Sequence, residues 1–134
     1  MPIAHITFAT RDVPATVAFL QQVFDWPLME RPANARSTGA WLKIGPDQEL
    51  HLNQVDEFLP PAGEGEYGRH LALGFPDERL DDIRAALNQL GAEVIEPQRP
   101  TPFRRFFFRD PNGYVFEVVG RLAPGSAGDD DGVQ

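Results

Sequence analysis

Four side chains suited to metal binding stand at corresponding places in the two halves of the chain. Three are its only histidines, His5, His51 and His70, and the fourth is the carboxylate of Glu117. Imidazole nitrogens and carboxylate oxygens suit a borderline divalent ion, and a chain without cysteine has no thiolate ligand. The set therefore predicts a divalent-metal site. The alternative is a hydrogen-bonded network of buried polar residues that holds no metal.

Glu117 interrupts an apolar strand near the end of the chain. Residues 106–119 read FFFRDPNGYVFEVV, in which two β-rich runs flank a turn sequence and predict an antiparallel hairpin. Successive strand residues face opposite ways, so Glu117 shares its face with Val115 and Val119. A buried ionised carboxylate is costly unless a cation, a metal or several donors compensate it. Glu117 is therefore expected to have such a partner.

The chain reads as two copies of one β-α-β-β-β unit, over about residues 3–54 and 69–120, joined by an exposed linker at 55–68. Shifts of 65 or 66 residues relate 4–8 to 69–73, 13–24 to 78–90, 28–30 to 94–96 and 48–52 to 114–118. His5 then falls on His70 and His51 falls on Glu117. This superposition favours the metal site over the polar network. If each unit curls into a half-barrel, pseudo-twofold symmetry brings the four side chains onto one concave face.

Two helices are expected, one in each unit. The first, from about Val13 to Phe24, has Asp12 as its N-cap, and the second, at 78–90, has Asp77 as its N-cap and Gly91 as its stop. Apolar residues recur along each helix at spacings of three and four, which predicts one buried stripe per helix.

The strands at 41–44 and 49–53 are expected to form a hairpin with one polar face. Leu50 and Leu52 would pack on the helix, while Glu49, His51 and Asn53 face the other way, which makes Glu49 a competing metal ligand. If Leu42 and Phe107 face the helices, the wall of the cup consists of Trp41, Lys43, Phe106 and Phe108. Alternatively, these aromatic residues are simply core.

Composition excludes several classes of protein. The formal net charge is −8 without a basic run, which disfavours nucleic acid and anionic membranes as partners. No apolar leader and no long apolar run occur, so a cytoplasmic location is the default expectation. The tail 122–134 holds three aspartates and little to bury, and we expect it to be disordered.

The repeat, the segment RHLAL at 69–73 and the ending FRDPNGYVFEV at 108–118 resemble the vicinal oxygen chelate superfamily. Its members include glyoxalase I, extradiol dioxygenases, methylmalonyl-CoA epimerase and the fosfomycin and bleomycin resistance proteins. The resemblance covers residues 3 to about 120 and implies an α+β fold whose tandem units form a curved mixed β-sheet cup. The superfamily's four metal positions fall on His5, His51, His70 and Glu117.

The resemblance implies one divalent ion per site, nickel, zinc, iron, manganese or cobalt, that captures a small substrate through two neighbouring oxygens and acts as a Lewis acid. The main expectation is a glyoxalase I-like lyase or isomerase in which Glu117 is both metal ligand and general base. Small bacterial glyoxalases usually have Glu where this chain has His51, which is a departure from their pattern. The resemblance also implies a homodimer, because many relatives build each cup from units of two chains.

Two alternatives stay open. One is an extradiol-type ring-cleaving dioxygenase, whose ligand triad maps onto His5, His70 and Glu117 and leaves His51 as an extra. The other is a protein that binds, or confers resistance to, a small antibiotic. Bleomycin-binding members typically lack the metal ligands, so the presence of all four here disfavours the bleomycin-binding form of that alternative.

Overall fold

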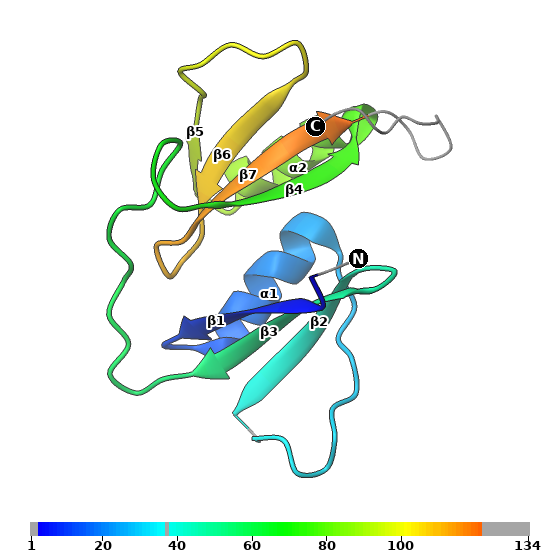
Figure 1. Ribbon diagram of the computed structural model, residues 1–134, viewed down its shortest axis with the longest axis vertical. Helices are drawn as coiled ribbons and strands as arrows, with labels where there is room; N and C mark the ends of the chain where they lie inside the picture. Colours follow the sequence, from blue (N-terminus) through cyan, green and yellow to red (C-terminus); the bar gives the residue numbers. More distant parts are fainter. Residues whose placement is uncertain (1–2, 37, 122–134) are drawn as a thin grey trace. The chain divides into compact units, whose positions relative to one another are not determined.

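The computed structural model describes residues 3–36 and 38–121 (Figure 1). The chain divides between Pro61 and Ala62 into two compact units, and each unit has one mixed sheet and one main helix. The tail at 122–134, which we expected to be disordered, lies outside the described residues. Among the described residues, no helix combines the length and apolar character needed to cross a membrane. The cytoplasmic location stays a prediction.

The first unit contains a three-stranded sheet. Its elements are β1 (His5–Thr10), α1 (Val13–Phe24), β2 (Gly39–Gly45) and β3 (Gln48–Gln54). The strand order is β1-β3-β2, in which β1 runs parallel and β2 antiparallel to β3. The further strand expected at 28–30 is reduced to an antiparallel bridge between Leu28 and Leu42.

Local signals place α1 where the sequence predicts it. Asp12 caps the helix by accepting a hydrogen bond from the Ala15 N–H to its Oδ1 over 3.0 Å. Asp25 ends the helix in the left-handed region, with φ of 61°. On β3, Leu50 and Leu52 are buried, as expected for the face that α1 covers.

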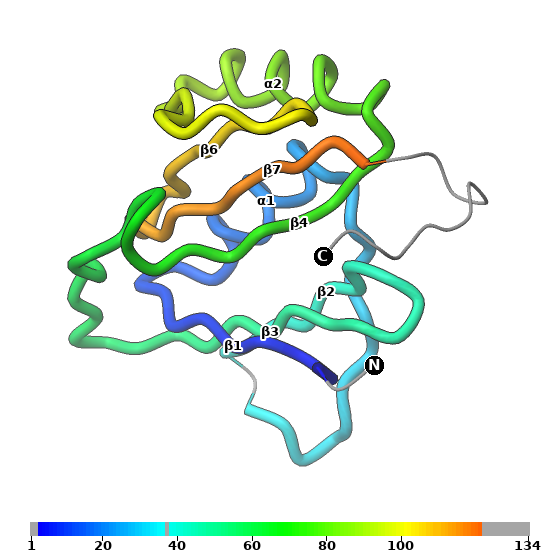
Figure 2. Tube along the Cα trace, turned by 45° about the horizontal axis from the view of Figure 1, so that its top comes forward, coloured from blue at the N-terminus to red at the C-terminus, as the bar shows by residue number. Residues whose placement is uncertain are grey.

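The second unit contains a four-stranded sheet. Its elements are β4 (Leu71–Pro76), the 3-10 turn η1 (Asp77–Arg79), α2 (Leu80–Gln89), β5 (Glu93–Ile95), β6 (Arg105–Arg109) and β7 (Val115–Arg121). The strand order is β4-β7-β6-β5, with β4 parallel to β7 and the other pairs antiparallel. Figures 1 and 2 both show α2 along one face of this sheet. These two mixed sheets confirm the α+β class and the tandem-unit fold.

The start of α2 differs from the prediction. Asp77 does not cap a helix; it opens η1, and α2 begins three residues later at Leu80. The carboxylate of Asp77 instead binds Arg104, whose Nε lies 3.1 Å from Oδ1. The expected cap was wrong because a long-range arginine takes the oxygen that a local N–H would otherwise use.

The predicted β6–β7 hairpin is confirmed, and its turn is built around the side chain of Asp110. Oδ1 of Asp110 accepts hydrogen bonds from the backbone N–H groups of Asn112 and Tyr114, each over 2.9 Å. Gly113 adopts φ of 98°, which glycine reaches without strain. Burial raises the pKa of Asp110, and these hydrogen bonds partly oppose the rise.

The faces of β6 are the reverse of the prediction. In the β6–β7 register Phe107 lies opposite Glu117, so the two side chains share a face. Phe106 and Phe108 point the other way: Arg84 of α2 lies over the Phe106 ring at 4.5 Å, and Phe108 stacks on Phe116. Phe106 and Phe108 are therefore core residues beneath the helix, which confirms the alternative for these two, and Phe107 belongs to the candidate site.

Candidate metal centre

In the first unit three aromatic rings form one stack. The ring centroids of His5 and His51 lie 4.0 Å apart with planes at 9°, and Trp41 stacks on His51 at 4.0 Å and 3°. Trp41 and His51 are partners in the register of β2 and β3, so the polar face of this hairpin is as predicted. His51 is 9% exposed, while His5 is exposed on β1. The structure thus brings two of the four predicted ligands together.

The stacked arrangement prevents His5 and His51 from binding one ion as they stand. A lone pair on an imidazole nitrogen lies in the plane of its ring, so two parallel stacked rings present their nitrogens in separate planes. At least one ring must turn before His5 and His51 can bind the same ion. Glu49, the competing ligand, instead contacts His51, with 2.8 Å between its Oε1 and Nε2 of the ring.

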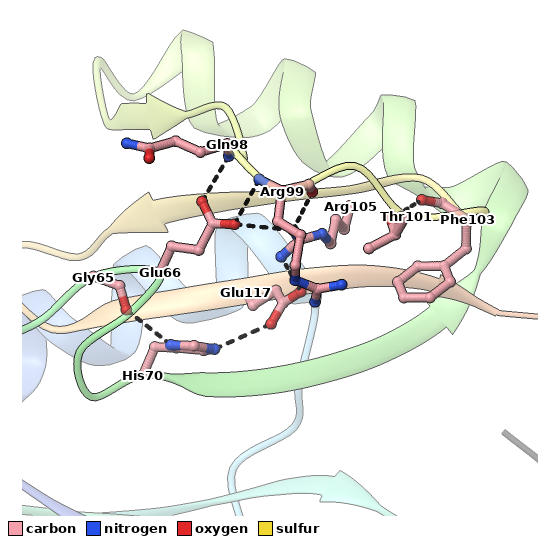
Figure 3. A network of polar contacts seen from close by, with 9 residues as sticks. All are labelled: Gly65, Glu66, His70, Gln98, Arg99, Thr101, Phe103, Arg105 and Glu117. Atoms are coloured by element: carbon pink, nitrogen blue, oxygen red, sulfur yellow. Dashed lines mark hydrogen bonds and ion pairs between the residues drawn. The ribbon is translucent and has the colours of Figure 1, made fainter. Parts of the chain in front are cut away.

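In the second unit His70 and Glu117 face each other across β4 and β7. His70 directly precedes β4, and Glu117 is buried in the middle of β7. Nε2 of His70 lies 3.1 Å from Oε1 of Glu117, and Nδ1 lies 2.9 Å from the carbonyl oxygen of Gly65 (Figure 3). Both ring nitrogens therefore point at acceptor oxygens, although a neutral imidazole has only one N–H.

This pairing fits a metal ligand. If the Nδ1–H of His70 donates to Gly65, the lone pair on Nε2 and the Glu117 carboxylate converge on one point, which either a proton or a cation satisfies. Anchoring the second ring nitrogen on a backbone carbonyl is the usual outer-shell support of a metal-bound histidine. One nitrogen and one oxygen donor also suit a borderline divalent ion. Within neither unit do the described residues contain a group of three or more such ligands.

Sequence reasoning missed the partner that Glu117 does have. Nη1 of Arg105 lies 3.1 Å from Oε2 of Glu117, and the Arg105 side chain is only 3% exposed. Arg105 was not among the site residues predicted from the sequence. The sequence signalled only that a buried carboxylate needs a cation or another partner. That this cation is Arg105, on the same face of β6 as Phe107, follows from the strand register of the structure.

The linker also contributes two buried carboxylates to the second unit, although we expected it to be an exposed loop. The side chains of Glu64 and Glu66 are 3% and 11% exposed. Glu64 accepts a hydrogen bond from the Val115 N–H over 2.7 Å, and Glu66 binds Arg105 with Oε2 3.0 Å from Nη2. The expectation was wrong for these two carboxylates because their partners lie far along the chain, where a local reading cannot find them.

Comparison with known proteins identifies the family. The profile described as "Glyoxalase-like domain" matches residues 5–119, from the first predicted ligand to just beyond the last. The chain belongs to the glyoxalase-like domain family. This glyoxalase-like domain is thereby a member of the vicinal oxygen chelate superfamily, as its resemblance implied.

Proteins similar to this glyoxalase-like domain include a metallothiol transferase and fosfomycin resistance proteins of known structure. Metallothiol transferase FosB of Shouchella clausii is 27% identical over 128 residues, which cover 90% of this chain and 82% of FosB. Two solved structures, each covering 90% of this chain, have a TM-score of 0.69. FosX from Mesorhizobium loti is 24% identical over 92% of its own chain. A glutamate-to-glutamine variant of FosX from Listeria monocytogenes, bound to manganese(II) and a dihydroxypropylphosphonic acid, is 25% identical over 90% of its chain.

Proposed function

We propose that this protein is a divalent-metal-dependent enzyme that inactivates fosfomycin or a closely related small phosphonate. One observation carries the metal part: His70 Nε2 and Glu117 Oε1 converge while Nδ1 of His70 is anchored on Gly65. The comparisons support the choice of substrate, because FosX of Listeria monocytogenes is a fosfomycin resistance protein, and curated proteins that match most of this chain are metallothiol transferases named FosB. The antibiotic-resistance alternative from the sequence thereby becomes the first candidate, ahead of the glyoxalase-like lyase.

The proposed reaction opens the three-membered epoxide ring of the phosphonate. A thiol or a water molecule forms a bond to a ring carbon, the carbon–oxygen bond of the ring breaks, and the proton of the nucleophile ends on the former ring oxygen. A bound divalent ion would supply Lewis-acid stabilisation of the charge that develops on that oxygen. His5, His51, His70 and Glu117 are the proposed ligands.

The residues of the second unit prepare this site before substrate arrives. The Gly65 carbonyl fixes the orientation of the His70 ring, and Arg105 holds Oε2 of Glu117. The Phe107 and His70 rings pack edge to face, with 5.2 Å between centroids, which restricts the orientation of the imidazole. Side chains held in this way need little rearrangement when a charged ligand binds.

A glyoxalase-like lyase remains the second candidate, favoured by the family that the chain matches. In that reaction Glu117 would act as general base and carry a proton between adjacent carbons. The two candidates differ in what they require of Glu117. Epoxide opening needs it only as a ligand, whereas isomerisation needs it to exchange a proton.

Phosphorus NMR of the metal-loaded protein with fosfomycin tests the first candidate. We expect the phosphonate signal to shift in the presence of water alone or of a thiol such as glutathione or cysteine. His70→Ala and Glu117→Gln should lose more activity than the roughly 10–100-fold that removal of an outer-shell partner costs. An unchanged signal with every nucleophile, together with turnover of the methylglyoxal–glutathione adduct, would make the lyase the correct assignment.

Manganese(II), zinc, nickel, cobalt and iron(II) should be compared in this assay, because the donor set does not select one of them.

We also propose that the enzyme is a homodimer. Sedimentation equilibrium of the full chain should then give about twice the 14.9 kDa of one chain. A single species at the monomer mass at assay concentration would contradict the dimer.

A further inference from the structure

Arg105 lies between two carboxylates that come from opposite ends of the second unit. Its Nη1 is 3.1 Å from Oε2 of Glu117 on β7, and its Nη2 is 3.0 Å from Oε2 of Glu66 in the turn before β4 (Figure 3). A guanidinium group is planar and rigid, so both carboxylates are held in one fixed geometry. Arg105 therefore connects Glu117 to a residue 51 positions earlier in the chain.

Glu66 is itself anchored by backbone groups. The N–H groups of Gln98 and Arg99 donate to its carboxylate over 2.7 and 3.1 Å, and Nη2 of Arg105 also donates to the Arg99 carbonyl over 2.6 Å. The hydrogen bond from Gln98, aided by those from Arg99 and Arg105, lowers the pKa of Glu66. Glu66 thus ties the turn before β4 to the loop after β5, and Arg105 closes the connection.

Packing fixes the position of Arg105 further. Its guanidinium lies over the Phe107 ring, 5.4 Å from the centroid, and the same ring contacts His70. Nε of Arg105 is buried and has no hydrogen-bond partner among the described residues. A buried arginine with an unsatisfied donor is costly to keep for stability alone.

We propose that Arg105, held by Glu66, is a positioning residue that fixes Glu117 as a one-oxygen metal ligand. Arg105 occupies Oε2, so only Oε1 faces Nε2 of His70. Glu66 acts through Arg105, because its hydrogen bonds among the described residues go to Arg105 and to the backbone of Gln98 and Arg99 and to neither His70 nor Glu117. This inference rests on the proposed function in one respect, namely that Glu117 binds the metal.

The affinity for manganese(II), measured from the electron paramagnetic resonance signal of the free ion, tests the proposal without any substrate. We expect Arg105→Gln to weaken binding by roughly 10–100-fold, as loss of an outer-shell partner does, and Glu66→Gln to weaken it less. Arg105→Lys should fall between wild type and Arg105→Gln, because lysine keeps the charge but not the planar fork. The direction of the change in manganese affinity distinguishes a positioning role from a simple charge effect. If Arg105 acted only as a nearby positive charge, its removal would strengthen binding of a cation.

Arg109→Gln is the matched control. Arg109 is on the same strand and pairs with Glu93, with 3.2 Å between Nε and Oε1, away from Glu117. Its replacement should change the affinity by no more than about twofold, as expected for a site without shared partners. Circular dichroism of each variant establishes that it folds, and Glu66→Gln, which keeps an acceptor for Gln98, serves if Arg105→Gln does not fold.

Unchanged or tighter manganese binding by folded Arg105→Gln, or by Glu66→Gln if only that variant folds, would overturn the proposal. Glu117→Ala separates this failure from failure of the proposed function. If Glu117→Ala binds manganese as well as wild type does, Glu117 is not a ligand and the proposed metal site falls. If Glu117→Ala loses binding while Arg105→Gln retains it, the metal site stands and only the positioning role falls.

Discussion

Trp41 and His51 are stacked face to face, with centroids 4.0 Å apart and planes 3° apart. Because His5 stacks on the same imidazole, binding of one ion by both histidines requires a ring to leave the stack. We therefore predict that zinc, which has no paramagnetic quenching of its own, changes the fluorescence of Trp41.

The chain has a second tryptophan, Trp26, which stacks on Phe24 and provides the matched control. The emission of Trp26→Phe, which reports Trp41 alone, should change on titration with zinc, and that of Trp41→Phe should not. A flat titration of Trp26→Phe at zinc concentrations that saturate the protein would contradict the prediction, because it would show that His51 neither moves off Trp41 nor binds the ion.

Phe107 and Phe108 are neighbours with equal burial and different roles, since they are 1% and 0% exposed but face opposite sides of the sheet. We expect Phe107→Ala and Phe108→Ala each to lower the free energy of unfolding by about 3–5 kcal/mol, measured by urea denaturation. Only Phe107→Ala should also weaken manganese binding, because its ring supports His70 and Arg105. Equal loss of affinity in both folded variants would assign the effect to general loosening of the sheet.

The lowered pKa of Glu66 predicts that the protein loses stability in acid. Its pKa is lowered from the ordinary 4.5, so the unfolded chain binds the proton more tightly than the folded chain does. Its contribution is complete above pH 4.5 and disappears as the pH falls through the lowered folded value. The free energy of unfolding of Glu66→Gln, followed from neutral pH downward, should therefore decline less steeply than that of wild type. Parallel curves would mean that Glu66 is no better stabilised in the folded state.

For Asp110 we predict a pH dependence of the opposite sign, namely a loss of stability as the pH rises. Burial raises its pKa above the ordinary 3.8, so the folded chain binds the proton more tightly. This group therefore reduces stability as the pH rises from 3.8 through the raised folded value. Asp110→Asn, whose side-chain oxygen can still accept from Asn112 and Tyr114, should remove that decline. The difference in unfolding free energy between Asp110→Asn and wild type across this interval is the measurement, and a difference independent of pH would contradict the prediction.

Local features were predictable from the sequence because nearby residues decide them. The bounds of α1 from Val13 to Phe24 follow from its cap and its apolar spacing, and the turn at Asp110 follows from its residue types. The alternation of Leu50 and His51 on β3 also follows from the period of a strand. The repeat pointed to all four candidate ligands, since it compares residue types at matching positions.

Long-range contacts decided the features that the sequence did not predict. Which face of β6 carries Phe107 depends on its register with β7 and on the face that α2 covers, and a run of three phenylalanines contains no such information. The burial of Glu66 depends on Arg105, 39 residues away, and on backbone N–H groups of a distant loop. The sequence by itself determined the residue types and local geometry of the site. The tertiary structure decided its charge partners, because the cost of burying a carboxylate is met by whichever donors the fold brings beside it.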